Sequence, residues 1–345
     1  MKKIISVLVF LAFLFFSFDG FLDFISYVKP DLTNYFAGEK KFKSLPVDVD
    51  RENISQAFED VNGIKYSMMR VVGKLPLPGD YGSYKIGARG DRKIEYYSDQ
   101  NIENNLKRIL ILGSSQSFGY FSGPVDNFAN QLAMELPEYR ISNFSVPGQM
   151  IAETKANWQR LSLLGEKYDK VIIIEGPIDF YNYCAPGFNL SLREGHRMAV
   201  MKLIDKASQI YSMLTGDQDK YQSPCLDESY NNLLIKNVFS DFKSVIEYGR
   251  DIGSETYIVV PPSPYVGNVN VENLSENNLA FRSLVIELGV DLEKEYQDIP
   301  QVIDMKNIFS GAGPMFLDWG GHFTPKGNKV FAQSVANFIK STDYN

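Results

Sequence analysis

The sequence predicts an α/β protein whose helices cover both faces of a mostly parallel sheet. Short apolar runs alternate with amphipathic segments from residue 107 onward, a rhythm typical of strands alternating with helices. The run at 170–175 (Lys-Val-Ile-Ile-Ile-Glu) has the composition of a strand buried on both faces. A chain of 345 residues, 44% of them hydrophobic, is large enough to bury such a sheet.

Each predicted element rests on its own pattern of apolar residues and chain breakers. Apolar runs ended by Gly, Pro or polar residues predict strands at 109–112, 140–146, 170–175, 255–260 and 301–304. Helical spacing of apolar residues predicts helices at 127–136, 151–164, 238–251, 277–288 and 325–340. In the first helix Phe128, Leu132 and Leu136 share one face, and Pro325 suits the first turn of the last helix.

Three regions are expected along the chain. Residues 1–29 contain Lys2 and Lys3 before a long apolar stretch, which is typical of an export signal. The stretch lacks an evident small-x-small cleavage site, so an uncleaved signal anchor is favoured over a removed signal peptide. Either alternative places the main domain outside the cytoplasm, beyond the membrane. Residues 30–104 are interpreted as a lead-in extension, and residues 105–345 as the main domain.

The main domain carries a loop-rich insertion at 180–235, which holds both cysteines, Cys184 and Cys225. The two can form a disulfide in an oxidising compartment, or they can be two unpaired small apolar residues.

Composition excludes other classes of function. A net charge of −7 disfavours nucleic acid as a partner. No His/Cys cluster has metal-ligand spacing and no cofactor motif is present, so a site without metal or cofactor is expected.

Residues 113–117 (Gly-Ser-Ser-Gln-Ser) follow the first strand directly and form the strongest functional signal. A turn at the carboxyl end of a parallel strand lies where open α/β sheets hold their chemistry. Ser115 is therefore a candidate nucleophile, although it can also be a serine that caps the next helix. His322 is the candidate base, and Asp318 is the carboxylate expected to orient it.

Other polar residues have less to support a catalytic role. The chain has two histidines, and His196 lies in a charged stretch typical of a solvated loop. Asp318 itself can be a solvated loop carboxylate. Glu175 and Asp179 suggest a carboxylate pair for glycoside hydrolysis, but nothing else in the sequence supports that reaction.

Over residues 105–340 the chain resembles the SGNH (GDSL-type) hydrolase superfamily. The matching blocks are 113–119 with Ser115, 143–148 ending in Gly148, and 318–328 with Asp318 and His322. The resemblance implies a flavodoxin-like three-layer α/β/α fold with a mostly parallel five-stranded sheet. It further implies a catalytic set of Ser115, His322 and Asp318, and an oxyanion hole from the backbone N–H groups of Ser115 and Gly148. The lead-in and anchor resemble members associated with exported surface polysaccharides.

Two positions depart from the superfamily pattern. Its third block carries an asparagine that donates to the oxyanion, and here Ile178 occupies that place; Asn182 is the nearest amide. The superfamily places His three residues after Asp, whereas here the spacing is four. The carboxylate reaches the imidazole if residues 320–321 bulge; otherwise a Ser–His dyad oriented by a backbone carbonyl remains.

The sequence therefore predicts an exported serine esterase or O-acyltransferase that forms an acyl-Ser115 intermediate. The expected substrate is an acylated carbohydrate, with acetyl as the expected acyl group, or another ester. Polysaccharide-export or acetylation proteins are the expected partners. The alternative is a catalytically impaired relative that binds polysaccharide or scaffolds an export complex. Ile178 and the longer Asp–His spacing favour that alternative.

Overall fold

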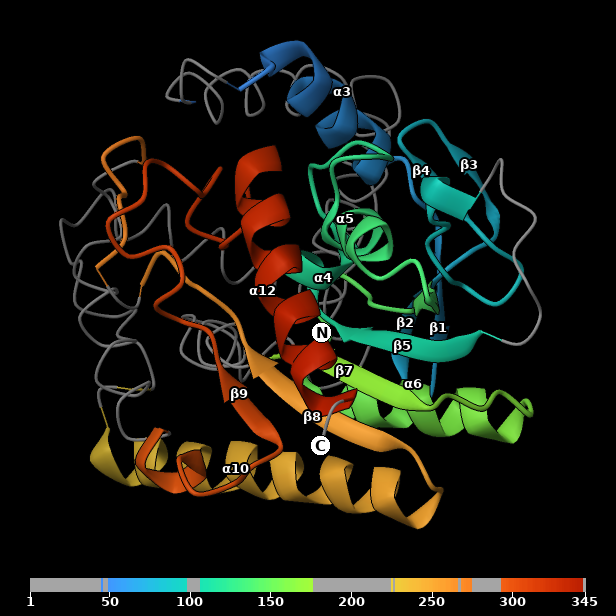
Figure 1. The fold of residues 1–345 in the computed structure, drawn as a ribbon, viewed down its shortest axis with the longest axis vertical. Helices are drawn as coiled ribbons and strands as arrows, with labels where there is room; N and C mark the ends of the chain where they lie inside the picture. The colour runs from blue at the N-terminus through green and yellow to red at the C-terminus, as the bar shows by residue number, and fades with distance from the viewer. Residues whose placement is uncertain are drawn as a thin grey trace, which may run out of the picture. The chain divides into compact units, whose positions relative to one another are not determined.

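The computed structural model divides the chain into two units, Met1–Leu45 and Pro46–Asn345. It describes residues 45, 49–97, 106–175, 225, 227–265, 268–274 and 293–343, and the account below concerns the second unit (Figure 1). The predicted anchor at 1–29, the predicted helix at 277–288 and residues 180–224 of the insertion lie outside the described residues. Within them, no helix is both long and apolar enough to cross a bilayer.

The central sheet has five parallel strands in the order β6-β5-β7-β8-β9. The strands are β5 (Lys107–Gly113), β6 (Tyr139–Asn143), β7 (Lys170–Ile174), β8 (Glu255–Val260) and β9 (Val302–Asp304). This order is the flavodoxin-like one, and it confirms the predicted three-layer α/β/α fold. The chain runs from β5 to β6 on one side and returns to β7 on the other, so the loops after β5 and β7 diverge at the carboxyl edge.

Alternate residues of each central strand face two separate cores. Ile109 and Ile111 of β5 pack with α5 (Phe128–Glu135) and α12 (Pro325–Asp343). Leu110 and Leu112 point the other way, toward α6 (Ile151–Leu163) and α10 (Glu228–Asp251). Figure 1 shows these two pairs of helices on opposite sides of the sheet. Burial on both faces explains why the strands read as continuous apolar runs.

The helix α10 begins earlier than predicted, at Glu228 rather than at residue 238. Asp227 caps it by accepting hydrogen bonds from the backbone N–H groups of Ser229 and Tyr230. Residues 228–235, which were assigned to the insertion, therefore belong to this helix. Its first turns are rich in polar residues, which hid the helical period. Cys225, just before the helix, is buried and disulfide-bonded, and the other cysteine, Cys184, lies outside the described residues.

The described part of the lead-in contains regular structure that the sequence analysis did not predict. It forms α3 (Arg51–Asn62), the hairpin β1 (Tyr66–Met69) and β2 (Gly73–Pro76), the hairpin β3 (Gly79–Tyr81) and β4 (Tyr84–Ile86), and the short 3₁₀ helix η1 (Glu95–Tyr97). Strands of three or four residues are too short to show alternation.

The contacts between the lead-in and the main domain include an apolar cluster and hydrogen bonds to an edge strand. Val72 and Leu75 of the first hairpin form a small core with Val146 and Ala156. At edge strand β6, the Tyr97 hydroxyl donates to the carbonyl of Tyr139 (3.0 Å) and accepts from the N–H of Ile141 (2.9 Å). The lead-in thus covers an edge that would otherwise present unpaired backbone groups.

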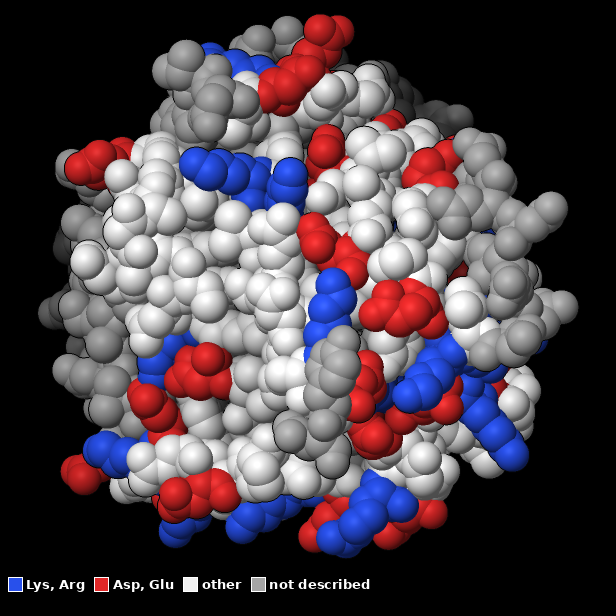
Figure 2. Space-filling model, in the orientation of Figure 1, with Lys and Arg blue, Asp and Glu red and all other residues white. Residues whose placement is uncertain are grey.

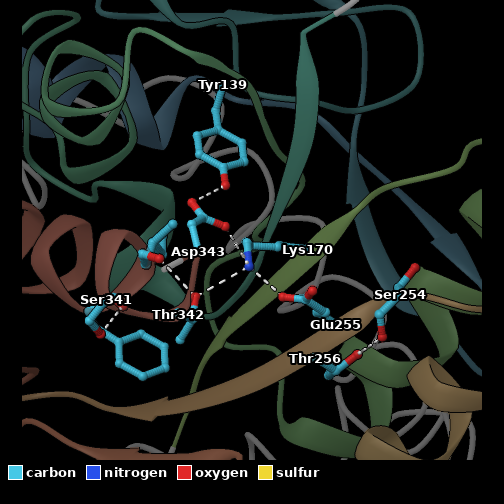
Figure 3. Close-up of polar contacts among 10 residues, drawn as sticks. Tyr139, Lys170, Ser254, Glu255, Thr256, Ser341, Thr342 and Asp343 are labelled. Carbon is cyan, nitrogen blue, oxygen red and sulfur yellow. Dashed lines mark hydrogen bonds and ion pairs between the residues drawn. The ribbon is translucent and has the colours of Figure 1, made fainter. Parts of the chain in front are cut away.

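A polar network ties the last turn of α12 to the amino-terminal ends of three strands (Figure 3). Lys170 of β7 binds Glu255 of β8 and Asp343 of α12, and Asp343 accepts a 2.5 Å hydrogen bond from Tyr139 of β6. Burial disfavours the Lys170 ammonium, but its hydrogen bonds to Glu255 and Asp343 outweigh burial and raise the Lys170 pKa.

Charges are mixed on the face of the molecule that Figure 2 shows. Figure 2 shows acidic and basic side chains interspersed on one face of the second unit, with no continuous basic area among the described residues on that face.

The Lys170 network is expected to stabilise the fold. Lys170→Met should lower the free energy of unfolding by about 1–3 kcal/mol, because two carboxylates lose their hydrogen-bonded cation. Lys329→Met, at an exposed position of α12, should change it by less than about 0.5 kcal/mol. Urea titration of both variants measures the difference, and equal stabilities would contradict the role of the network.

Candidate active site

Ser115 lies at the carboxyl edge of the sheet, at the start of the short helix α4 (Ser115–Phe118) that follows β5. The backbone at Gly113 lies very close to the end of β7. A Cβ atom at Gly113 would be only 2.4 Å from the carbonyl oxygen of Ile174, so only glycine fits there. Ser114 is the N-cap residue, and its side chain makes no capping hydrogen bond to α4. Ser115 is therefore the first helical residue, at the sheet's chain-reversal point, and is 7% exposed.

Arg92 from the lead-in holds the other end of α4. Its guanidinium donates to the carbonyls of Phe118 (2.6 Å), Gly119 (2.7 Å) and Ser122 (2.8 Å). Asn143, at the end of β6, donates to the carbonyl of Ser117 (2.9 Å). The last carbonyls of α4 thus have charged or polar donors, which fixes the helix that begins at Ser115.

Arg92 is 2% exposed and forms no ion pair within the described part of the chain. Burial lowers the pKa of Arg92 to about 10, while Tyr84 acts to raise it, so Arg92 is a cation at neutral pH. The guanidinium carbon lies 4.2 Å from the centre of the Tyr84 ring. Carbonyl oxygens and this ring replace the water that the cation has lost.

His322 and Asp318 form a hydrogen-bonded pair in the loop before α12. His322 Nδ1 lies 2.8 Å from Asp318 Oδ1 and 2.9 Å from Oδ2. The loop closes through hydrogen bonds from Leu317 N–H to the carbonyl of His322 (2.7 Å) and from Gly321 N–H to the carbonyl of Asp318 (3.2 Å). Gly321 has a φ of 79°, which favours glycine, so the longer Asp–His spacing is absorbed by a turn.

The pairing determines which imidazole nitrogen is available. A carboxylate only accepts, so Nδ1 carries the proton and Nε2 is left with its lone pair. Asp318 is 12% exposed in its side chain, which differs from a solvated loop carboxylate. The nearby Tyr120 has a raised pKa, chiefly through burial and also through the Asp318 charge.

Side chains from residues 115–121, the serine segment, contact residues 318–322, the histidine loop, directly. Gln116 Nε2 donates to the carbonyls of Gly321 (2.9 Å) and Pro262 (3.1 Å). The rings of Tyr120 and Phe121 lie 4.9 Å and 4.8 Å from the His322 ring, centre to centre. Ser115 and His322 are therefore held on adjoining segments, although no hydrogen bond joins these two described side chains. Catalytic hydrogen bonds often tighten only when substrate binds.

Gly148 lies on the loop after β6, beside the serine turn. Its N–H donates to Ser114 Oγ at 3.1 Å, so this expected oxyanion donor already has an acceptor. Gly148 is exposed, and a ligand can reach it. The serine hydroxyl of residue 114 can rotate away and leave the N–H for another acceptor.

The remaining predicted polar residues divide into two groups. Glu175 is fully buried and accepts from Thr154 Oγ1 (3.0 Å), which is a core position rather than a place for glycoside hydrolysis. Ile178, Asp179, Asn182 and His196 lie outside the described residues. No cluster of three or more His, Cys, Asp or Glu side chains suited to a metal is found in the part of the chain that the structure describes.

Sequence reasoning missed Arg92 and Gln116. Arg92 stands in the lead-in, where no pattern marks it as buried. Gln116 falls inside the motif, but its two acceptors lie 146 and 205 residues away along the chain. Only the assembled sheet brings these partners together, and no local signal indicates them.

Searches for similar proteins found no matching family model and no matching curated protein. Among solved structures, a psychrotrophic esterase from Pseudoalteromonas sp. aligns over 69% of this chain and 100% of its own, at 11% identity and a TM-score of 0.39. A catalytic mutant of an acetylxylan esterase from Geobacillus stearothermophilus aligns over 70% and 96%, at 13% identity and a TM-score of 0.39. A GDSL-like lipase from Bacteroides thetaiotaomicron aligns over 72% of this chain and 95% of its own, at 11% identity and a TM-score of 0.39. Likeness this weak does not assign a function, which must come from the residues of the site.

Gln116 is expected to hold the histidine loop against the serine helix. Gln116→Met should lower the free energy of unfolding by about 1–3 kcal/mol, because two carbonyls lose their donor. Gln297→Met, at an exposed position, should stay within about 0.5 kcal/mol of the parent. Thermal and urea unfolding measure the stability of both variants. A Gln116→Met variant as stable as Gln297→Met would show that the hydrogen bonds of Gln116 to Gly321 and Pro262 do not stabilise the fold.

Proposed function

We propose that this chain is an SGNH-type serine esterase or O-acyltransferase. The observation that carries the proposal is the His322–Asp318 pair at 2.8 Å, held by Gln116 against the helix that begins at Ser115. A serine nucleophile, a histidine base and a carboxylate that orients the histidine are the set used for acyl transfer through serine. Ser115, His322 and Asp318 are proposed for these three roles. The blocks at 113–119, 143–148 and 318–328, in superfamily order, support the assignment.

In the proposed reaction, Ser115 Oγ attacks the carbonyl carbon of an ester while His322 Nε2 takes the hydroxyl proton. Asp318 stabilises the resulting imidazolium through Nδ1. The tetrahedral intermediate collapses to acyl-Ser115, and the leaving alcohol receives the proton from Nε2. An acceptor, either water or a sugar hydroxyl, then gives its proton to His322 Nε2 and attacks the acyl carbonyl carbon. The bond to Ser115 Oγ breaks, the acyl group leaves on the acceptor, and His322 returns the proton to Ser115 Oγ.

The oxyanion of each tetrahedral intermediate needs donors. We propose the N–H groups of Ser115 and Gly148, the latter after Ser114 Oγ has turned away. The substrate is proposed to be a carbohydrate ester with a small acyl group such as acetyl. Esterase and transferase differ only in the acceptor.

The chemistry predicts an activated serine. A fluorophosphonate probe should modify Ser115 of the purified full-length protein stoichiometrically, because the probe reacts with serines that have a neighbouring base. Ser115→Ala and His322→Ala should abolish labelling, and Asp318→Asn should slow it by a factor on the order of 10³–10⁴, since the wrong tautomer is then favoured. Mass spectrometry identifies the labelled residue.

Ser114→Ala is the matched control, because Ser114 stands beside the nucleophile but has no proposed role as one. Its labelling rate should stay the same or rise. Labelling at Ser114 or Ser117 instead of Ser115 would overturn the assignment of the nucleophile.

We further propose that residues 1–29 anchor the protein in a membrane and that the main domain is exported. The disulfide at Cys225 suits an oxidising compartment. Deletion of residues 1–29 is expected to move the protein from the membrane fraction to the soluble fraction, because it removes the apolar stretch. Immunoblots of fractionated cells measure this, and a full-length chain in the soluble fraction would refute the anchor.

A second candidate function is polysaccharide binding without catalysis. The observation that favours it is the Gly148 N–H, which is already bonded to Ser114 Oγ rather than free for an oxyanion. Polysaccharide binding that survives Ser115→Ala, in a folded protein whose serine is never labelled, would support this candidate.

A further inference from the structure

Lys74 is a cation beside the candidate oxyanion site that sequence reasoning did not identify. It belongs to β2 of the lead-in hairpin, and its Nζ lies 3.7 Å from the point where a Cβ on Gly148 would be. The ammonium is therefore at van der Waals distance from the face of the glycine on which a side chain would stand. Gly148 is exposed and Lys74 is half-buried, so one ligand can touch both residues.

The hairpin that carries Lys74 is fixed against this loop. Gln149 Nε2 donates to the carbonyl of Val72 (2.9 Å). Val72 and Leu75 pack with Val146, two residues before Gly148, and with Ala156 of α6. The backbone of Lys74 is thus held near the Gly148 loop by contacts that do not involve the lysine side chain.

The Lys74 ammonium is not neutralised by a close carboxylate. No acidic oxygen of the described residues lies within ion-pair distance of Nζ, which instead lies 5.1 Å from the centre of the Tyr66 ring. Glu153 acts on it from further away and is itself bonded to the N–H of Met150 (3.2 Å). Burial lowers the pKa of Lys74, and Glu153 opposes that shift. A partly dehydrated cation interacts more strongly with an anion than a solvated one does.

We infer that Lys74 is a catalytic residue that contacts the acyl carbonyl oxygen and supplies positive charge as that oxygen becomes an anion. This inference rests on the proposed function, because it needs an oxyanion at Gly148. The Gly148 N–H donates to Ser114 Oγ at 3.1 Å, and Lys74 Nζ lies 3.7 Å from the Cβ position of the same glycine, so the donor and the cation border one residue. A charged donor there adds to the backbone N–H groups and is worth most in the transition state.

The test compares Lys74→Met, Lys74→Arg and the control Lys65→Met in the full-length protein, with an aryl acetate as substrate. Lys65 lies just before the same hairpin and is exposed. Lys74→Met should lower kcat by about 10²-fold with little change in KM, as expected when one oxyanion donor is lost. Lys74→Arg should recover about 10-fold or more of that loss, because it keeps the charge. Lys65→Met should match the parent.

Two further measurements separate this role from a structural one. Glu153→Gln should leave kcat within about threefold, whereas it would reproduce the Lys74→Met defect if Lys74 served only to pair with Glu153. Unfolding temperatures should be similar for Lys74→Met and Lys65→Met. A Lys74→Met variant as active as the parent, with Ser115 still labelled by the fluorophosphonate, overturns the inference and leaves the proposed function standing. A folded parent that is neither labelled nor active overturns both.

Discussion

The burial of Arg92 is the constraint on which the site depends. A guanidinium without a carboxylate among the described residues is removed from water, and the protein stabilises it with carbonyl oxygens and the Tyr84 ring. Those carbonyls belong to the end of α4 and the turn after it, so the cation is satisfied only when the serine helix has its native shape. A residue of the lead-in thus contributes directly to the hydrogen bonding of the turn that carries Ser115.

The parallel sheet accounts for the rest of the arrangement. The chain adds β6 on one side of β5 and then adds β7 on the other side. The helix α5, which joins β5 to β6, and the helix α6, which joins β6 to β7, therefore lie on opposite faces of the sheet. The loops after the strands diverge there and leave room for the serine turn. Polar groups at the opposite edge of the same strands, Tyr139 and Lys170 among them, bind the end of α12. One edge of the sheet is therefore closed by ion pairs, and the other holds the candidate chemistry.

The sequence was sufficient to predict the fold, and the predicted site residues Ser115, His322 and Asp318 stay a prediction. Strands buried on both faces give long apolar runs, and β8 was predicted with the bounds the structure has. The lead-in was not predicted, because its strands are too short to show a period. The turn that joins Asp318 to His322 was predicted only as a condition, since two glycines permit it, whereas the hydrogen bond from Gln116 to this turn was not predicted. Partners that meet only in the folded chain, such as Lys74 and Gly148, leave no local pattern.

Gln116 and Gly321 are hydrogen-bonded although 205 residues separate them along the chain, and this separation matters during folding. Contacts over such distances form late, because the intervening chain must first be ordered. In the proposed reaction, Ser115 has no base until then and is an ordinary alcohol. A partly folded chain is therefore expected to be unreactive at Ser115, and the proposed reactivity is expected only with the native structure.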